Sequence, residues 1–196
     1  MTPFTTLTAI AAPLIRDNID TDAIIPSREM KSVGKTGLAD GLFAGWRYTA
    51  MGSRDPDPGF VLNDPHYAKA RILLAGANVG CGSSREHAAW ALAEYGFRAI
   101  VAVSFNPIFR GNCVRNGIVP VEIDANGIEA DGPITIDLPR QILTTTSGRE
   151  MPFAIDAEAK AMLIGGLDAI DLTLTRADEI ARFREQDRAR RPWVYF

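Results

Sequence analysis

The chain has 196 residues, of which 46% are hydrophobic and 23% are charged, and its formal net charge is −3 at neutral pH. A chain of this length and composition can bury a core within one globular domain, unlike a disordered or fibrous protein. Nucleic-acid binding usually leaves a basic stripe, whereas the one dense basic run, "RFREQDRARR", also carries acids and is typical of a solvated helix face. We therefore expect no nucleic acid among its partners.

Targeting and redox signals are weak in this sequence. The opening "MTPFTTLTAIAAPLI" lacks a basic segment and a continuous apolar run, so neither a signal peptide nor a membrane anchor is expected. Cys81 and Cys113 stand far apart, and with His66 and His87 they cannot complete a zinc or iron-sulfur site. We expect a cytoplasmic chain with free thiols that binds no metal by itself.

The middle of the chain predicts alternating strands and helices. Short apolar runs typical of buried strands occur in residues 70–79, 98–104 and 118–123. A helix is predicted after Ser83, ending at Gly96, and a second one within 106–117, where Pro107 starts it and Gly117 ends it. Strands that alternate with crossover helices favour a parallel sheet.

The last third of the chain has a different pattern of apolar and polar residues. Residues 128–155 alternate apolar and polar positions between turn signals, which favours an antiparallel meander. Helices are expected over 156–166 and 175–191, the second opened by a capping pattern at Thr175 and Asp178. The sequence therefore predicts a single α/β domain over residues 1–196, with a partly parallel central sheet, β-rich flanks and a helical C-terminal extension from about residue 156.

The segment "GANVGCGSSREHAAWAL" (76–92) combines bare backbone with the start of a helix. Glycines leave amide groups uncovered, and a helix N-terminus adds unpaired donors and partial positive charge, so this junction is suited to an anion. Ser83 and Glu86 also fit a capping box, which would be purely structural. A cap does not explain Arg85 and the second serine, so we favour an anion-binding site. No phosphate-binding fingerprint is present, so we expect the bound anion to be a carboxylate.

Three acids in "RDNIDTDAIIP" (16–26) are a second cluster. Asp17, Asp20 and Asp22 lack the remaining ligands of a calcium loop, so turn hydrogen bonds are the favoured interpretation. We expect these acids to brace the glycine loop.

Together these stretches resemble a known family. "GANVGCGSSREHAAWAL" is similar to the G-x-x-x-G-x-G-S-S-R-E-H signature of the swivelling domain of the aconitase superfamily. "RDNIDTDAIIP" and "SFNPIFRGNCVRNGIVPV" (104–121) resemble stretches of the 3-isopropylmalate dehydratase small subunits, in the same order and over nearly the whole chain. The resemblance implies a swivelling β/β/α three-layer domain.

The resemblance also implies a reaction and a set of site residues. Family members isomerise a hydroxy-dicarboxylic acid by removing and re-adding water, with a [4Fe-4S] cluster on a large partner subunit. Ser83 would be the base, and Ser84 and Arg85 would bind substrate carboxylate. Gly80, Gly82, Asp20 and Asp22 would support that loop.

The loop over 26–43 aligns with the family segment that lies over the substrate. Lys35 and Thr36 would bind substrate there, but many relatives have arginine where this chain has Lys35, and lysine lacks the bidentate fork that suits a carboxylate. The substrate is therefore 3-isopropylmalate or a related acid such as citramalate. A non-catalytic partner protein with the same fold is the alternative, although the intact Ser83 and Arg85 argue against it.

Overall fold

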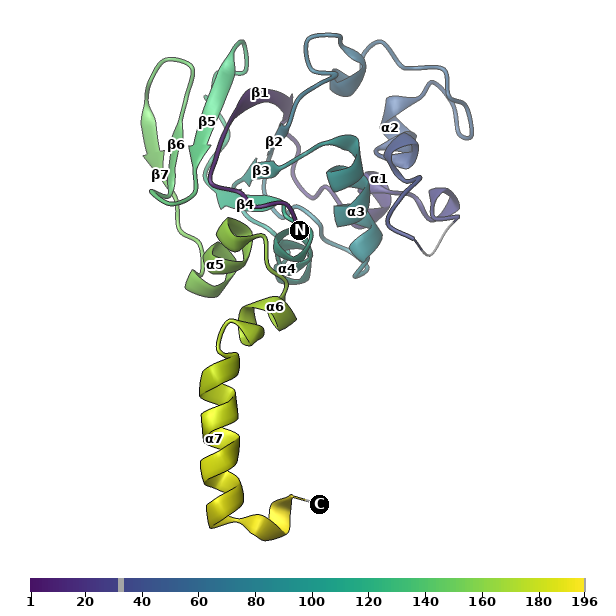
Figure 1. Ribbon diagram of the computed structural model, residues 1–196. Coiled ribbons are helices and arrows are strands. Elements are labelled where there is room, and N and C mark those ends of the chain that lie inside the picture. Colours follow the sequence, from purple (N-terminus) through teal and green to yellow (C-terminus); the bar gives the residue numbers. More distant parts are fainter. Residues whose placement is uncertain (32–33, 196) are drawn as a thin grey trace.

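The computed structural model describes residues 1–31 and 34–195 and shows a mixed α/β domain with a protruding C-terminal helix (Figure 1). Seven strands form one sheet in the order β4-β3-β2-β1-β5-β6-β7. The α/β class predicted from the sequence is confirmed, and the predicted β-rich flank is the antiparallel half of this same sheet.

The sheet changes character at its central strand. Four strands are parallel to one another: β1 (Thr6–Leu14), β2 (Ile72–Ala75), β3 (Ala99–Ala102) and β4 (Val119–Glu122). The meander adds three antiparallel strands: β5 (Pro133–Asp137), β6 (Ile142–Thr144) and β7 (Glu150–Pro152). β1 pairs with β2 on one side and β5 on the other, so the long N-terminal strand joins both halves.

Helices connect and flank the strands. Their bounds are α1 (Thr21–Ile24), α2 (Ala44–Arg47), α3 (Glu86–Tyr95), α4 (Pro107–Arg115), α5 (Ala157–Gly165), α6 (Ala169–Leu174) and α7 (Ala177–Arg190). Short 3-10 helices lie at Ser27–Glu29, Ala39–Gly41, Val61–Asn63 and Pro192–Val194. Within the described residues, no helix is both long and apolar enough to cross a membrane.

Two apolar clusters cover the two faces of the sheet. In β2, Leu73 and Ala75 belong to the cluster that also contains Ile24 of α1 and Ala88, Ala91 and Leu92 of α3. Ile72 and Leu74 belong to the cluster shared with the antiparallel strands and α5. β2 is therefore buried on both faces, as its continuous apolar sequence predicts.

The crossover helices end where the sequence predicts. Gly96 adopts a left-handed conformation, with φ of 119°, and its N–H closes the last turn of α3. Asn106 caps the start of α4 with its side chain, and Pro107 occupies the first turn. These caps fix the lengths of both crossovers and hence the positions of the loops that follow the strands.

The C-terminal helices differ from prediction in two places. Thr175 does not cap α7, because its hydroxyl donates to the Leu172 carbonyl and its backbone continues the turn that ends α6. The α7 helix begins at Ala177, after Arg176, without a side-chain cap. The α6 helix was not predicted from the sequence; it begins with a capping box between Asp168 and Asp171.

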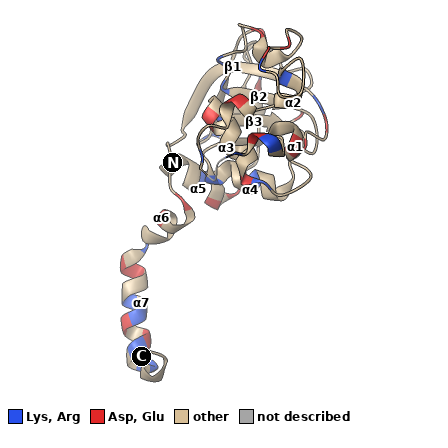
Figure 2. Cartoon of the chain, turned by 90° about the vertical axis from the view of Figure 1, so that its right-hand side faces the viewer, with Lys and Arg blue, Asp and Glu red and all other residues tan. Residues whose placement is uncertain are grey.

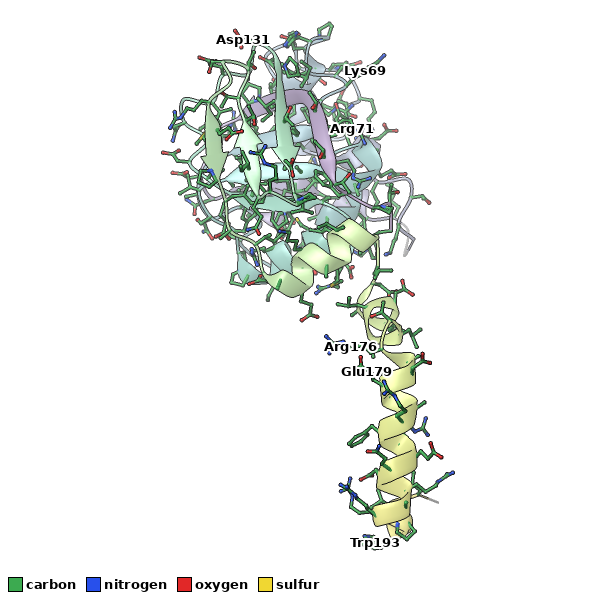
Figure 3. The ribbon with its side chains drawn as sticks, turned by 60° about the vertical axis from the view of Figure 1, so that its left-hand side comes forward. Lys69, Arg71, Asp131, Arg176, Glu179 and Trp193 are labelled. Carbon is green, nitrogen blue, oxygen red and sulfur yellow. The ribbon has the colours of Figure 1, made fainter. Side chains whose placement is uncertain are left out.

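The last helix stands away from the domain. No residue of α7, the whole of which is described, is buried, and both signs of charge alternate along it (Figure 2). Trp193 lies near the far tip and is 70% exposed (Figure 3). Tyr195 donates to Asp187 at 2.7 Å, so the tip folds back on its own helix.

Truncation after Arg176 should leave the rest of the fold intact, because α7 contributes no buried side chain to it. We expect the free energy of unfolding of the truncated chain to stay within about 0.5 kcal/mol of the full chain, as for surface changes generally. Chemical denaturation followed by circular dichroism measures this difference. A loss of several kcal/mol would show that α7 packs on the domain.

Candidate active site

The site is assembled from loops that follow three neighbouring parallel strands. Residues 15–20 follow β1, residues 76–85 follow β2 and residues 103–106 follow β3. Because the carboxyl ends of parallel strands lie at one edge of a sheet, these loops meet there. This edge is where open α/β sheets commonly bind ligands.

Backbone hydrogen bonds join the first two loops like a short ladder. Asn18 N–H donates to the Ala77 carbonyl at 2.8 Å, Gly80 N–H to Ile19 at 2.7 Å and Thr21 N–H to Cys81 at 3.0 Å. A side chain adds to this ladder, since Asp17 Oδ1 accepts from Ala77 N–H at 2.6 Å. The course of the glycine loop is therefore set largely by the main chain.

The third loop holds the other side of the glycine loop. Val79 N–H donates to the Ser104 carbonyl at 3.1 Å, and Asn106 N–H donates to the Val79 carbonyl at 2.9 Å. The Ser104 hydroxyl accepts from Asn78 N–H at 2.9 Å. The three sequence motifs, which are far apart along the chain, thus form one continuous backbone network.

Two positions of the loop require glycine for different structural reasons. Gly80 has φ of +76°, and an added Cβ would lie 2.0 Å from Cγ of the buried Phe109. Gly82 has φ of +85°, but an added Cβ would come no closer than 3.6 Å to its surroundings. Gly80 is therefore required by both conformation and space, and Gly82 by conformation alone.

The loop delivers Ser83 and Ser84 to the surface just before α3. Both serines are exposed. The hydroxyl of the buried Thr21 donates to the Ser83 carbonyl at 2.8 Å and holds this part of the loop outside the helix. The Ser83 side chain is therefore presented at the surface by a backbone that is itself anchored.

The predicted capping box is wrong. α3 begins at Glu86, its N-cap is Arg85 in extended conformation, and no side chain caps it. The Glu86 carboxylate instead accepts a hydrogen bond from Asn116 Nδ2 at 3.0 Å. Ser83 thus lies too early to cap the helix, and the amides of its first turn are left without a side-chain acceptor.

Arg85 and the acids of the first loop form the charged part of the site. The guanidinium of Arg85 forms an ion pair with Asp22, a residue of α1. Asp20 caps α1, since its Oδ1 accepts from Ala23 N–H at 2.6 Å. The acids of this loop therefore bind loop amides and Arg85, which is the arrangement expected of turn and bracing residues.

A hollow of about 660 Å³ opens beside the start of α3. It is lined by Met30, Lys31, Ser84, Arg85, Glu86, His87 and Trp90. The His87 ring packs on Trp90 with centroids 4.6 Å apart, so His87 forms part of an aromatic wall. The hollow therefore combines an apolar wall with a cationic group and a serine, a combination suited to a small acid with an alkyl substituent.

The structure places Lys35 near this hollow and leaves part of its loop undescribed. Lys35 Nζ donates to Asn116 Oδ1 at 3.3 Å and lies 5.5 Å from the Trp90 ring centroid. Thr36, next to it, is exposed. Residues 32 and 33 of the predicted 26–43 loop lie outside the described residues. Asn116 and Trp90 were not predicted from the sequence, because the contacts of Asn116 with Glu86 and of Trp90 with Lys35 join residues that are distant in sequence.

The cysteines show no metal-binding arrangement. Both Cys81 and Cys113 are free thiols, and burial raises the pKa of the Cys113 thiol far above its ordinary value. Among the described residues, no group of three or more histidine, cysteine or acidic side chains is placed to hold a metal ion. Cys113 is thus a core residue of α4.

Comparison with known sequences identifies the family. The aconitase C-terminal domain family matches residues 1–126, and the family of C-terminal domains of 3-isopropylmalate dehydratase small subunits matches residues 170–195. The chain belongs to the 3-isopropylmalate dehydratase small-subunit family. A relative from Cupriavidus necator with that name is 53% identical over 206 aligned residues, covering 100% of this chain and 99% of the relative. One from Paramagnetospirillum magneticum is 45% identical, covering 99% of this chain and 100% of the relative.

A solved structure supports the same assignment. The crystal structure of a 3-isopropylmalate dehydratase from Methanocaldococcus jannaschii matches with a TM-score of 0.71 and 25% identity. The match covers 90% of this chain and 99% of the archaeal chain. The resemblance noted in the sequence is thereby confirmed for family and fold.

Gly80 and Gly82 offer a test of how the loop is built. We expect Gly80→Ala to lower the free energy of unfolding by about 3 kcal/mol, because a strained φ and a clash with Phe109 add. Gly82→Ala, which meets no clash, should cost about 1 to 2 kcal/mol. Urea denaturation of both variants measures the difference, and equal costs would contradict the close approach of Phe109.

Proposed function

We propose that this chain is the small subunit of a hydro-lyase that interconverts 2- and 3-isopropylmalate by loss and re-addition of water. Family membership and the relatives' names support this reaction and its place in leucine biosynthesis. The observation that carries the proposal is the anchored loop that presents Ser83, Ser84 and Arg85 in front of α3, with Ser84 and Arg85 lining the hollow.

The complete site requires a partner large subunit, as a heterodimer or heterotetramer. The family resemblance implies a [4Fe-4S] cluster on that subunit, which would supply a Lewis acid for the substrate hydroxyl. This chain brings no ligand set of its own within its described residues. Its part is to bind the acid and move a proton, and we expect the complex in the cytoplasm.

Ser83 is the proposed base. As the alkoxide, its Oγ accepts the proton from the carbon next to a substrate carboxylate and becomes the hydroxyl. The electron pair of the broken C–H bond forms the carbon–carbon double bond, and the substrate hydroxyl leaves the neighbouring carbon as hydroxide with the electron pair of the C–O bond. A serine oxygen is a weak base, so the charge it carries must be stabilised by nearby donors. The uncapped amides at the start of α3 and the Arg85 guanidinium are such donors.

Ser84, Arg85, Lys35 and Thr36 are the proposed substrate-binding residues. Arg85 offers a planar fork for a carboxylate, and in this structure one of its nitrogens, Nη1, already pairs with Asp22 Oδ1. A substrate carboxylate would therefore share or replace the Asp22 contact. The wall of Met30 and Trp90 would face the alkyl substituent of the acid.

Co-expression with a cluster-bearing large subunit tests the activity and the choice of acid. The complex should hydrate isopropylmaleate faster than citraconate or cis-aconitate. Preference for citraconate would assign the chain to a methyl-substituted malate, and absence of turnover with all three acids would favour the non-catalytic alternative.

Ser83→Ala in the assembled complex should lower kcat by at least about a hundredfold and leave KM within a few-fold. A lowered kcat beside a nearly unchanged KM identifies a group that acts in the transition state rather than in substrate binding. Because Ser83 does not cap α3, its removal should hardly change the melting temperature. Turnover near the wild-type rate would place the base elsewhere.

Lys35→Ala should raise KM about tenfold, because a charge-assisted hydrogen bond to a carboxylate contributes about 1.5 to 3 kcal/mol. Lys35→Arg, which keeps the charge and adds a fork, should retain or improve turnover of isopropylmalate. Steady-state kinetics of both variants provide the measurement. An unchanged KM in the alanine variant would remove Lys35 from the site.

A further inference from the structure

Glu94, which lies in the last turn of α3, makes an unusual set of contacts. Its Oε1 accepts from Gly37 N–H at 2.6 Å, and its Oε2 accepts from Leu38 N–H at 2.6 Å and from Ala39 N–H at 2.9 Å. One carboxylate thus takes three consecutive backbone donors from a distant loop. Successive amides that converge in this way form a nest for an anion, and here the anion is a side chain of the same protein.

The loop backbone is shaped for this contact. Gly37 has φ of +82° and Leu38 lies in the right-handed helical region. A left-handed residue followed by a right-handed one turns neighbouring N–H groups toward a common point. An added Cβ at Gly37 would meet nothing within 4 Å, so glycine is favoured here by the positive φ and not by a lack of space.

The position of Glu94 on its helix is unfavourable without these contacts. A carboxylate near a helix C-terminus faces the negative end of the helix dipole and destabilises the helix. Desolvation raises the pKa of Glu94, yet the hydrogen bonds from Gly37, Leu38 and Ala39 lower that pKa by more, to below its ordinary value. The charged form of Glu94 is therefore favoured by the loop that it holds.

The same helix also contacts the neighbouring part of the loop. Trp90 lies one turn before Glu94, so both side chains share a face of α3. Lys35 Nζ lies over the Trp90 ring at 5.5 Å and donates to Asn116, the residue that ends α4. α3 thus connects its own beginning, where Ser84 and Arg85 lie, with residues 35–39 near its end.

We propose that Glu94 is a positioning residue for substrate binding: by fixing the backbone of Gly37, Leu38 and Ala39 against α3, it places Lys35 beside the hollow. This inference rests on the proposed function, in which Lys35 binds substrate. Glu94 touches no substrate. Its effect is on the fraction of molecules in which the loop is already in the binding position, and that fraction scales the apparent affinity.

Glu94→Ala in the assembled complex should therefore raise KM about fivefold and leave kcat within about twofold. At saturating substrate, binding shifts the loop into its binding position in nearly all molecules, so kcat is retained. Glu94→Gln, which keeps one acceptor oxygen but no charge, should fall between wild type and Glu94→Ala. Glu129→Gln, a change at an exposed glutamate between β4 and β5, is the matched control and should leave KM unchanged.

A purely structural role gives a different result. Loss of folded protein would lower kcat through the active fraction and leave KM unaltered. Hydrogen exchange on the free chain measures the clamp directly, and the amides of residues 37–39 should exchange faster in Glu94→Ala than in the control. Unchanged exchange would overturn the clamp.

A double variant separates this inference from the proposed function. If Glu94 acts through Lys35, Glu94→Ala combined with Lys35→Ala should raise KM no further than Lys35→Ala alone. A raised KM in Lys35→Ala beside an unchanged KM in Glu94→Ala would overturn the inference and leave the proposed function standing. An unchanged KM in Lys35→Ala, with fast exchange in Glu94→Ala, would show a real clamp but overturn the substrate role of Lys35 and with it the inference.

Discussion

The backbone ladder between residues 18–21 and the glycine loop is the interaction on which the rest of the site depends. It fixes the loop through N–H and carbonyl groups, and these bonds require that the two chains approach closely. That approach is possible because Gly76 has no Cβ: a side chain there would collide with Arg16 and Asp17. On the other side of the loop, a Cβ at Gly80 would collide with Phe109 of α4. Once the ladder is formed, the buried hydroxyl of Thr21 holds the Ser83 carbonyl. The exposed Ser83 and Ser84 therefore project from a segment whose conformation does not depend on their own side chains.

The two loops of the site are attached to the rest of the fold in different ways. The glycine loop is held by main-chain bonds to strands and loops on both sides, and these bonds are retained in any side-chain protonation state. The N–H groups of residues 37–39 are held by one exposed carboxylate on α3, while Arg47 donates to the Ala39 carbonyl and the Leu38 side chain is buried. Side-chain hydrogen bonds at the surface are easier to open than a network of main-chain bonds. The loop that carries Ser83 is thus the more rigid one, which suits the proposed role of Ser83 as the base.

Sequence patterns predicted the parallel half of the fold because its signals are local. The apolar runs of β2, β3 and β4, the Asn106 cap and Gly96 all act within a few residues. β1 was missed, because "TLTAIAAPL" mixes polar and small residues and its place at the sheet centre comes from its pairing partners. Ser83 and Arg85 were recognised by motif, whereas Glu94, Trp90 and Asn116 have partners about 30 to 80 residues away. The capping box at Ser83 failed for the same reason: Thr21, distant in sequence, holds the backbone outside the helix.

The ion pair of Arg85 with Asp22 sets a condition on how this site can work. In the chain alone, the fork that would bind a substrate carboxylate already has an anionic partner. The Asp22 side chain is 57% exposed and that of Arg85 is 22% exposed, so the pair is partly screened by water and a dianionic acid can compete for the guanidinium. Until then Asp22 of α1 holds the Arg85 guanidinium. Arg85 is also the N-cap residue of α3, whose first-turn amides have no side-chain cap, so two sources of positive potential belong to this end of the helix. Assembly with a large subunit that removes water would strengthen both sources at once, since the same charges interact more strongly in a drier site.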